Sequence, residues 1–178
     1  MNSDTQDIDG PLVSCADVLR TLADRKFGSW TGLPPSCSLP EVTQHFPLLN
    51  DGVGLARLGR TKRQFRMLVV EGYEHPVRIW LDGSQVLMLD VQYPNFSSEG
   101  DVAIKELGEP EAKLDYDWGT LPIERGEWVY ASRGLTLFNA SNNLSVLHLA
   151  VYRRTPLQAY EDNFRLHLGK KPFPQREP

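Results

Sequence analysis

The sequence predicts an α+β protein built on an antiparallel β-sheet, with helices mainly on one face of the sheet. Three observations lead to this fold class. Apolar residues recur at helical spacing near both ends of the chain, whereas the middle holds short runs of β-branched and aromatic residues that are typical of strands. Asp82-Gly83 separates two such runs, and this dipeptide favours a hairpin turn. At 178 residues with 40% hydrophobic and 24% charged side chains, the chain has the composition of a globular protein.

Two helices are expected before the sheet. The first begins near Ser14, because the next apolar residues share one helical face, and Gly28 is placed to cap its end. The second begins after Ser38, which has the capping-box spacing to Glu41, and Pro47 ends it. The apolar face of the first is Cys15, Val18, Leu19, Leu22 and Ala23, and that of the second is Leu39, Val42, Phe46 and Leu49.

Two further helices are expected after the first set of strands. A short one around Val102 is closed by Gly108. The terminal helix begins at Thr155 as N-cap with Pro156 in its first turn, and Gly169 caps its end. The predicted strands are 67–70, 77–81, 86–91, 128–130, 135–138 and 146–152.

The order of these elements suggests a tandem duplication within one compact domain. Each half reads as a helix, then Leu-Gly, then a meander of strands. The predicted limits are a flexible tail at 1–12, a first unit at 13–98, a second unit at 99–169 and a tail at 170–178.

Four motifs of the second unit carry a resemblance to known proteins: Leu107-Gly-Glu-Pro110, Glu127-Trp-Val-Tyr130, Gly134-Leu-Thr-Leu-Phe138 and Val146-Leu-His-Leu149. Their order resembles the tandem α/β architecture of the β-lactamase inhibitor proteins, and the half-repeat resembles small outer-membrane assembly lipoproteins. The resemblance implies a non-catalytic binder that places a sheet face against a partner protein. Those proteins are exported and the inhibitors carry disulfides, whereas Cys15 and Cys37 here are expected to be reduced thiols.

The sequence shows no strong catalytic constellation, so no cofactor or metal is expected. The four histidines lack the spacings that bring metal ligands together. Glycines between residues 52 and 59 do not have the dinucleotide-binding spacing and indicate a loop. Cys37 and His45 could form a dyad only if the fold joined them, and an idle thiol is the preferred interpretation.

Charge is distributed unevenly. The net charge is −4, yet residues 99–127 hold nine acidic against three basic side chains, and residues 57–66 hold five basic side chains and no acidic one. The acidic segment could steer a basic protein partner, with Glu109, Glu111, Asp115 and Asp117 as the candidate residues. It would otherwise be a solvated loop. The basic segment gives RNA binding as a weaker alternative, and nucleic acid is not the expected partner.

Strand alternation defines a candidate binding face. If the aliphatic positions pack on helices, aromatic and charged side chains point the other way and form a face suited to protein binding. A second core layer would give the same pattern. The candidate partner-binding residues are Arg78, Trp80, Met88, Trp128, Tyr130, Phe138, His148 and Tyr152.

The sequence therefore favours a non-catalytic protein-binding module, such as an immunity-type neutraliser or inhibitor of a toxin or enzyme. The alternative is a small enzyme or ligand-binding domain with a pocket beside Trp30 or Trp118 that uses Asp115 and Asp117. Apolar runs are too short to span a membrane, and the first ten residues lack an apolar leader segment, so a cytoplasmic protein is expected.

Overall fold

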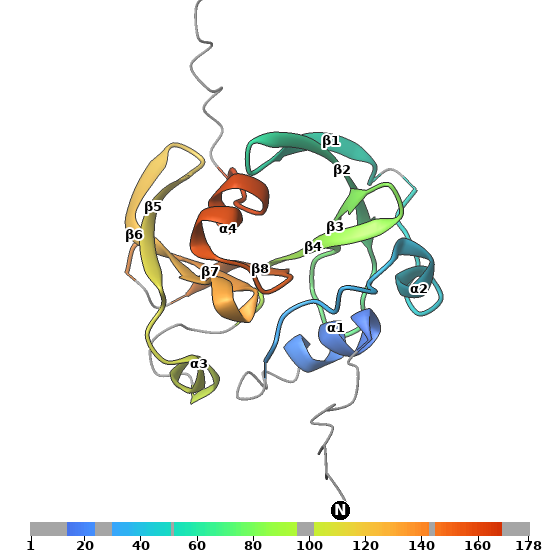
Figure 1. Ribbon diagram of the computed structural model, residues 1–178, viewed down its shortest axis with the longest axis horizontal. Coiled ribbons are helices and arrows are strands. Elements are labelled where there is room, and N and C mark those ends of the chain that lie inside the picture. Colours follow the sequence, from blue (N-terminus) through green and yellow to red (C-terminus); the bar gives the residue numbers. More distant parts are fainter. Residues whose placement is uncertain (1–13, 24–29, 51, 96–101, 143–144, 169–178) are drawn as a thin grey trace, which may run out of the picture.

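The computed structural model describes residues 14–23, 30–50, 52–95, 102–142 and 145–168. Its centre is one sheet of eight antiparallel strands in the order β1-β2-β3-β4-β8-β7-β6-β5 (Figure 1). The predicted α+β class and the antiparallel sheet are thus confirmed. The strands are β1 (Gly54–Leu58), β2 (Thr61–Leu68), β3 (Val77–Asp82), β4 (Gln85–Gln92), β5 (Ala112–Trp118), β6 (Leu121–Tyr130), β7 (Leu135–Asn139) and β8 (Val146–Tyr152).

The sheet consists of two four-stranded meanders that meet where β4 pairs with β8. The two meanders correspond in strand order, but nothing further supports the duplication, which stays a prediction. The sheet is strongly curled, so that β1–β2 and β5–β6 rise on either side of α4 (Figure 1). The helices of the described residues are α1 (Cys15–Ala23), α2 (Leu39–Thr43), α3 (Val102–Leu107), the 3₁₀ turn η1 (Ala131–Arg133) and α4 (Leu157–Asn163).

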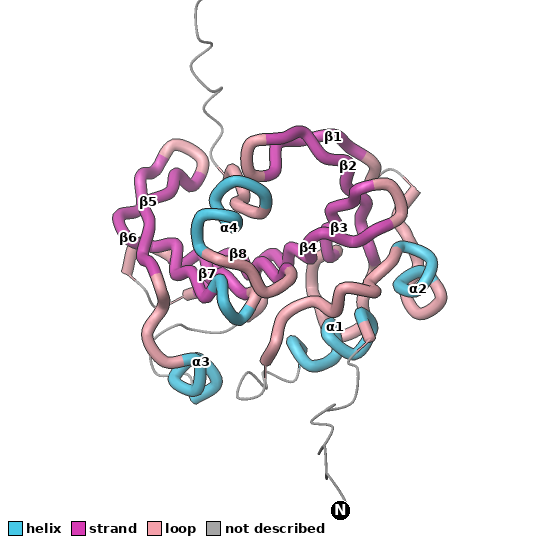
Figure 2. Tube along the Cα trace, viewed as in Figure 1, coloured by secondary structure: helices cyan, strands magenta, loops and turns pink. Residues whose placement is uncertain are grey.

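Helices cover both faces of the curled sheet. Helices α1, α2 and α3 lie outside the curl, whereas α4 lies inside it (Figure 2). The outer core packs Leu19 of α1 against strand residues such as Ile79 and Leu149. The inner core packs Tyr160 of α4 against Tyr152, whose rings stack with centroids 5.0 Å apart. Three of the four α-helices of the described residues thus lie on one face, as predicted, and α4 lies on the other (Figure 2).

Residues 164–168, which follow α4, connect the β1–β2 end of the curled sheet to the β5–β6 end. Gly59 N–H donates to the Arg165 carbonyl at 2.8 Å, and Leu58 forms an isolated β-bridge with Leu166. On the other side, the Arg165 guanidinium donates to the Asp115 carbonyl of β5 at 2.8 Å. Gly59 is required here, because its φ is +55° and a Cβ would lie 2.2 Å from the Asp162 carbonyl oxygen.

Several predicted elements need correction. Residues 52–59, expected as a loop, contain strand β1, and residues 112–118, for which no strand was predicted, form β5. Helix α2 ends at Thr43, and α4 has Pro156 as N-cap with no side-chain cap from Thr155. The predicted tails at 1–12 and 170–178, and the caps Gly28 and Gly169, lie outside the described residues.

Candidate functional site

The predicted partner-binding face exists, but it is covered. Arg78, Trp80, Met88, Phe138, His148 and Tyr152 all point into the curl, as strand alternation predicts. Trp80 is 1% exposed, and Met88, Phe138 and Tyr152 are 0% exposed, because α4 and the curled edges pack over them. The expectation of an open aromatic face is therefore wrong, and the pattern belongs to a second core.

Trp128 and Tyr130 lie on the opposite face of the sheet from Trp80. Both belong to the outer core, where the Tyr130 hydroxyl donates to the Gly108 carbonyl at 3.1 Å. Burial raises the pKa of Tyr130 to about 12. Lys113 lies over the Trp128 ring, with its ammonium 4.6 Å from the ring centroid. These two aromatic residues thus support the sheet from its outer side and do not join the face predicted for a partner.

The acidic candidates make contacts within the chain. Glu111 accepts hydrogen bonds from the backbone and hydroxyl of Ser132 at 2.7 and 2.6 Å. Asp115 accepts from the Arg125 N–H at 2.7 Å, and Glu109 lies 3.9 Å from the Lys113 ammonium. Glu99 and Asp101, which contribute to the predicted acidic charge, lie outside the described residues.

Asp115 and Asp117 lie on the edge strand β5. The register of β5 against β6 shifts between Leu114 and Tyr116, which places Asp115 at a bulge, while Asp117 lies opposite Pro122. Trp30 is buried in the outer core. The residues predicted to line a pocket therefore do not come together at one site. Trp118 instead lies next to His148 on the inner face of the sheet.

A cluster of side chains surrounds the buried carboxylate of Asp90 on the inner face of the sheet. Asp90 on β4 and His148 on β8 are 0% and 4% exposed, and a 2.7 Å contact joins Asp90 Oδ1 to His148 Nδ1. Arg78 on β3 places Nη1 3.7 Å from Asp90 Oδ2. Trp118 lies edge-on to the His148 ring at 5.1 Å.

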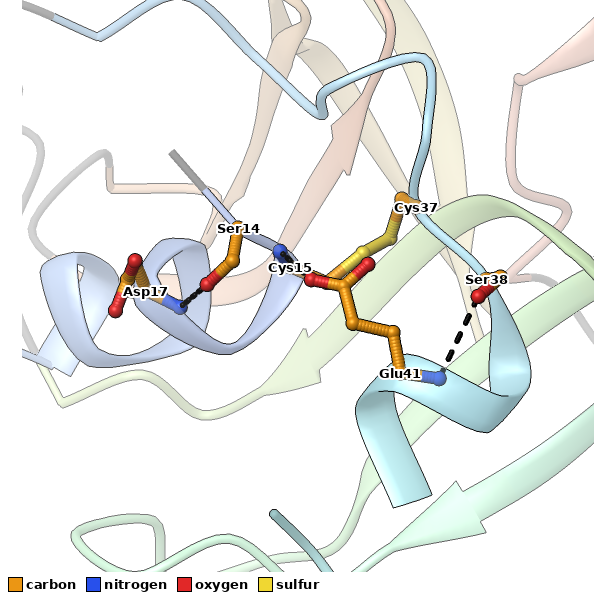
Figure 3. Close-up of a disulfide and its surroundings, with 6 residues drawn as sticks. All are labelled: Ser14, Cys15, Asp17, Cys37, Ser38 and Glu41. Carbon is orange, nitrogen blue, oxygen red and sulfur yellow. Dashed lines mark hydrogen bonds between the residues drawn. A yellow bond between two sulfur atoms is a disulfide. The ribbon is translucent and has the colours of Figure 1, made fainter. Parts of the chain in front are cut away.

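The two cysteines are paired, which corrects the expectation of reduced thiols. A disulfide joins Cys15 to Cys37, with Cα atoms 5.4 Å apart, and both residues are buried (Figure 3). Glu41 extends the connection, because its carboxylate accepts from the Cys15 N–H at 3.0 Å (Figure 3). Structural disulfides are typical of oxidising compartments, so the pairing removes one support for a cytoplasmic location. It also excludes the Cys37–His45 dyad.

A second candidate surface lies at the β1 edge of the sheet. Val53 and Leu55 are 57% and 63% exposed, and their spacing of two residues places them on one face of the strand. Leu49 and Val69 lie on neighbouring segments at 38% and 44% exposed, and alternation along β2 directs Val69 to the face opposite Leu55. The Leu49 N–H donates to the Met67 carbonyl and the Val69 N–H to the Pro47 carbonyl, so 47–49 extends the line of β1 along β2. We call Val53 and Leu55 the apolar edge.

The outer side of β1 bridges to Leu166 at Leu58, but it is unpaired with any other strand of the described residues around Leu55. Leu58 and Thr61 flank the two-residue turn and form a hydrogen-bonded pair, and pairs alternate along the hairpin. Ala56 therefore bonds to Arg63, whereas the N–H and C=O of Leu55 point away from β2. No other strand of the described chain pairs with β1 at Leu55.

Cations lie beside the apolar edge. Arg57 is directly opposite Lys62 in a non-hydrogen-bonded pair, on the same face of the hairpin as Leu55. The Arg57 Nε donates to the Gly59 carbonyl at 3.2 Å. Arg60 lies 2.8 Å from Asp162, and Arg63 lies 3.2 Å from Asp82.

Neither the buried cluster of Asp90 and His148 nor the apolar edge was predicted from the sequence, and each omission has an identifiable reason. Asp90 and His148 share a predicted face, but the pairing of β4 with β8 joins segments 58 residues apart and has no local signal. The apolar edge does have one, because Val53, Leu55 and Arg57 alternate with small residues as in a strand. The neighbouring glycines concealed this pattern.

Comparison with protein-family models, curated proteins and solved structures gives no match for this chain. Among the described residues, no helix combines the length and apolar character needed to cross a membrane. No three His, Cys, Asp or Glu side chains of the described part of the chain lie close enough together to hold a metal ion.

Proposed function

We propose that this protein is a non-catalytic protein-binding module that accepts an extended segment of its partner as an added strand on β1. The observation that carries the proposal is that Val53 and Leu55 are exposed apolar side chains on an edge strand that no other strand of the described residues pairs with at Leu55. An added strand gains main-chain hydrogen bonds from the edge, and the adjacent side chains give specificity. Proteins usually protect such edges, because an exposed apolar edge invites pairing with another chain.

The charge at this edge favours an acidic partner segment. Arg57 and Lys62 lie beside Leu55, so the positive charge of this edge would attract an acidic side chain on the added strand. An alternating apolar and acidic strand therefore fits both features. The basic partner expected from Glu109, Glu111, Asp115 and Asp117 would need the opposite, β5–β6 edge of the sheet. That contact, neutralisation of a toxin or enzyme, and a cytoplasmic location remain predictions.

Two substitutions of Leu55 test separately whether its backbone hydrogen bonds and its side chain contribute to binding the added strand. Leu55→Pro removes the outward N–H, and Leu55→Glu adds negative charge where an acidic strand would lie. Leu121→Glu is the matched control, because Leu121 is also 63% exposed but lies on the β5–β6 hairpin. Circular dichroism would verify that all three variants fold.

The binding measurement uses a fluorescent peptide of alternating valine and glutamate, together with proteins captured from the native extract. We expect the wild type and Leu121→Glu to bind, and both Leu55 variants to lose binding. Rising salt should weaken binding, since the charged contacts are exposed. Equal binding by the Leu55 variants, or no binding by the wild type, would contradict the proposal.

A further inference from the structure

A polar cluster on the inner face has unused hydrogen-bonding capacity. Asp90 Oδ2, Arg78 Nε and Trp80 Nε1 are buried and have no hydrogen-bond partner within the described residues. The three side chains are neighbours, because Arg78 lies opposite Asp90 and Trp80 lies two residues farther along β3. Buried polar groups are normally satisfied, so such a group of exceptions needs a physical cause.

Aromatic rings lead from this cluster towards solvent. The His148 ring contacts Trp118, Trp118 contacts Tyr93 edge-on at 6.1 Å, and Tyr93 contacts His75 at 5.3 Å. Tyr93 is 44% exposed, whereas His148 is buried. The rings of Trp118 and Tyr93 thus offer apolar faces next to the buried polar groups, which is the usual composition of a small-molecule site.

The backbone at Tyr93 is held in an unusual conformation. Its φ is +45°, a left-handed value that non-glycine residues rarely adopt. Residues are kept in such conformations where the surroundings determine them, and they are enriched at ligand-contacting sites. The Tyr93 ring is therefore positioned against Trp118 at a conformational cost.

From these observations we infer that Asp90, His148, Arg78 and Trp80 form the floor of a binding site for a small, neutral, planar ring molecule that carries a hydrogen-bond donor. The donor would bond to Asp90 Oδ2, and the ring would lie against Trp118 and Tyr93. Neutrality follows from the floor itself, because a cation would meet Arg78 and an anion would meet Asp90. This site is separate from the β1 edge and does not depend on the function proposed there.

Phenol is a suitable probe, with toluene, benzoate and benzylammonium as controls that remove the donor or add charge. Small rings bind at best in about the millimolar to micromolar range, so NMR is the appropriate measurement. We expect phenol to shift the ring signals of His148 and the indole signals of Trp80 and Trp118 in a saturable manner. The three controls should bind at least about tenfold more weakly, the difference that one hydrogen bond to a charged group supplies.

Two variants test the assigned residues. Asp90→Asn should weaken phenol binding while toluene is unaffected, and Tyr93→Ala, which leaves the buried floor intact, should weaken both. Leu121→Ala, at an exposed residue of the β5–β6 hairpin, should change neither. Equal binding of phenol and toluene would overturn the inference. Failure of phenol to bind the wild type would also overturn it, and ordered water would then account for the unsatisfied atoms.

Discussion

Glu127 is the residue whose environment departs most from that of an ordinary surface acid. Its side chain is 0% exposed, and it accepts from the Tyr160 hydroxyl at 2.5 Å and from Arg165 at 2.8 and 3.0 Å. Burial raises the pKa of Glu127, and the nearby Arg165 opposes that shift. The network ties α4 and residues 164–168 to β6, so one acid counted in the predicted acidic surface holds the inner core together.

Replacing Arg165 by methionine should destabilise the protein by about 3–5 kcal/mol, because it leaves a buried carboxylate without its counter-ion. The measurement is the free energy of unfolding in urea. Arg154→Met is the control, since Arg154 is exposed and donates to the Ser132 carbonyl; it should cost about 1 kcal/mol or less. A similar loss in the two variants would show that Glu127 does not depend on Arg165.

The raised pKa of Glu127 also predicts how stability depends on pH. The folded state binds this proton more tightly than the unfolded state, so the contribution of Glu127 is complete below its ordinary pKa of 4.5. That contribution falls as pH rises through the raised folded value. The difference in unfolding free energy between the wild type and Glu127→Gln should therefore shift in favour of the wild type on acidification from neutral pH. Urea titrations of both proteins between neutral and mildly acidic pH would measure it, and a difference independent of pH would refute the assignment.

Among the secondary-structure elements, those with strong local signals were predictable. The Asp82-Gly83 turn, with Gly83 at φ +59°, joins β3 to β4 as expected, and the β-branched run of β8 forms a strand. The edge strands β1 and β5 were not predicted, because glycine and charge are tolerated where one side of a strand is unpaired. The burial of Trp80 and Tyr152 depends on α4 folding back over the sheet, a long-range contact that strand alternation cannot reveal.

The register of β1 predicts a contrast between adjacent proline substitutions. Ala56→Pro removes a hydrogen bond to β2 and should cost about 1–3 kcal/mol more than Leu55→Pro, whose N–H faces outward. Chemical denaturation would measure both. If Leu55→Pro destabilised the protein more than Ala56→Pro, the N–H of Leu55 would be bonded to β2. Leu55 would then have no free backbone N–H for an added strand.

The disulfide should contribute measurably to the packing of α1. Cys15 and Cys37 are 22 residues apart, and closing a loop of this length stabilises a protein by about 3 kcal/mol in the chain-entropy description. Urea unfolding with and without reductant should show a loss of this order. The Cys15→Ser/Cys37→Ser double variant controls for other effects of the reductant, to which it should not respond. An unchanged wild-type midpoint would contradict the prediction.

At the scale of the whole molecule, both cores combine residues from the two meanders. The outer core joins Ile79 and Leu89 to Leu149, and the inner core joins Trp80 to Tyr152. Antiparallel pairing of β4 with β8 continues the sheet through the junction. Neither meander can therefore bury its apolar residues without the other, so the sequence units 13–98 and 99–169 should not fold as independent domains.

Unfolding should consequently be a single cooperative transition. Val151 lies on β8 opposite both Leu89 of β4 and Leu135 of β7, and it is 0% exposed. Val151→Ala should lower the free energy of unfolding by about 1–3 kcal/mol, because it leaves a small cavity at the junction. The transition followed by tryptophan fluorescence and by far-ultraviolet circular dichroism should move by the same amount, since the two probes report different parts of one unit. Two separate transitions, of which Val151→Ala shifts only one, would contradict this prediction. They would mean that the meanders β1–β4 and β5–β8 unfold independently.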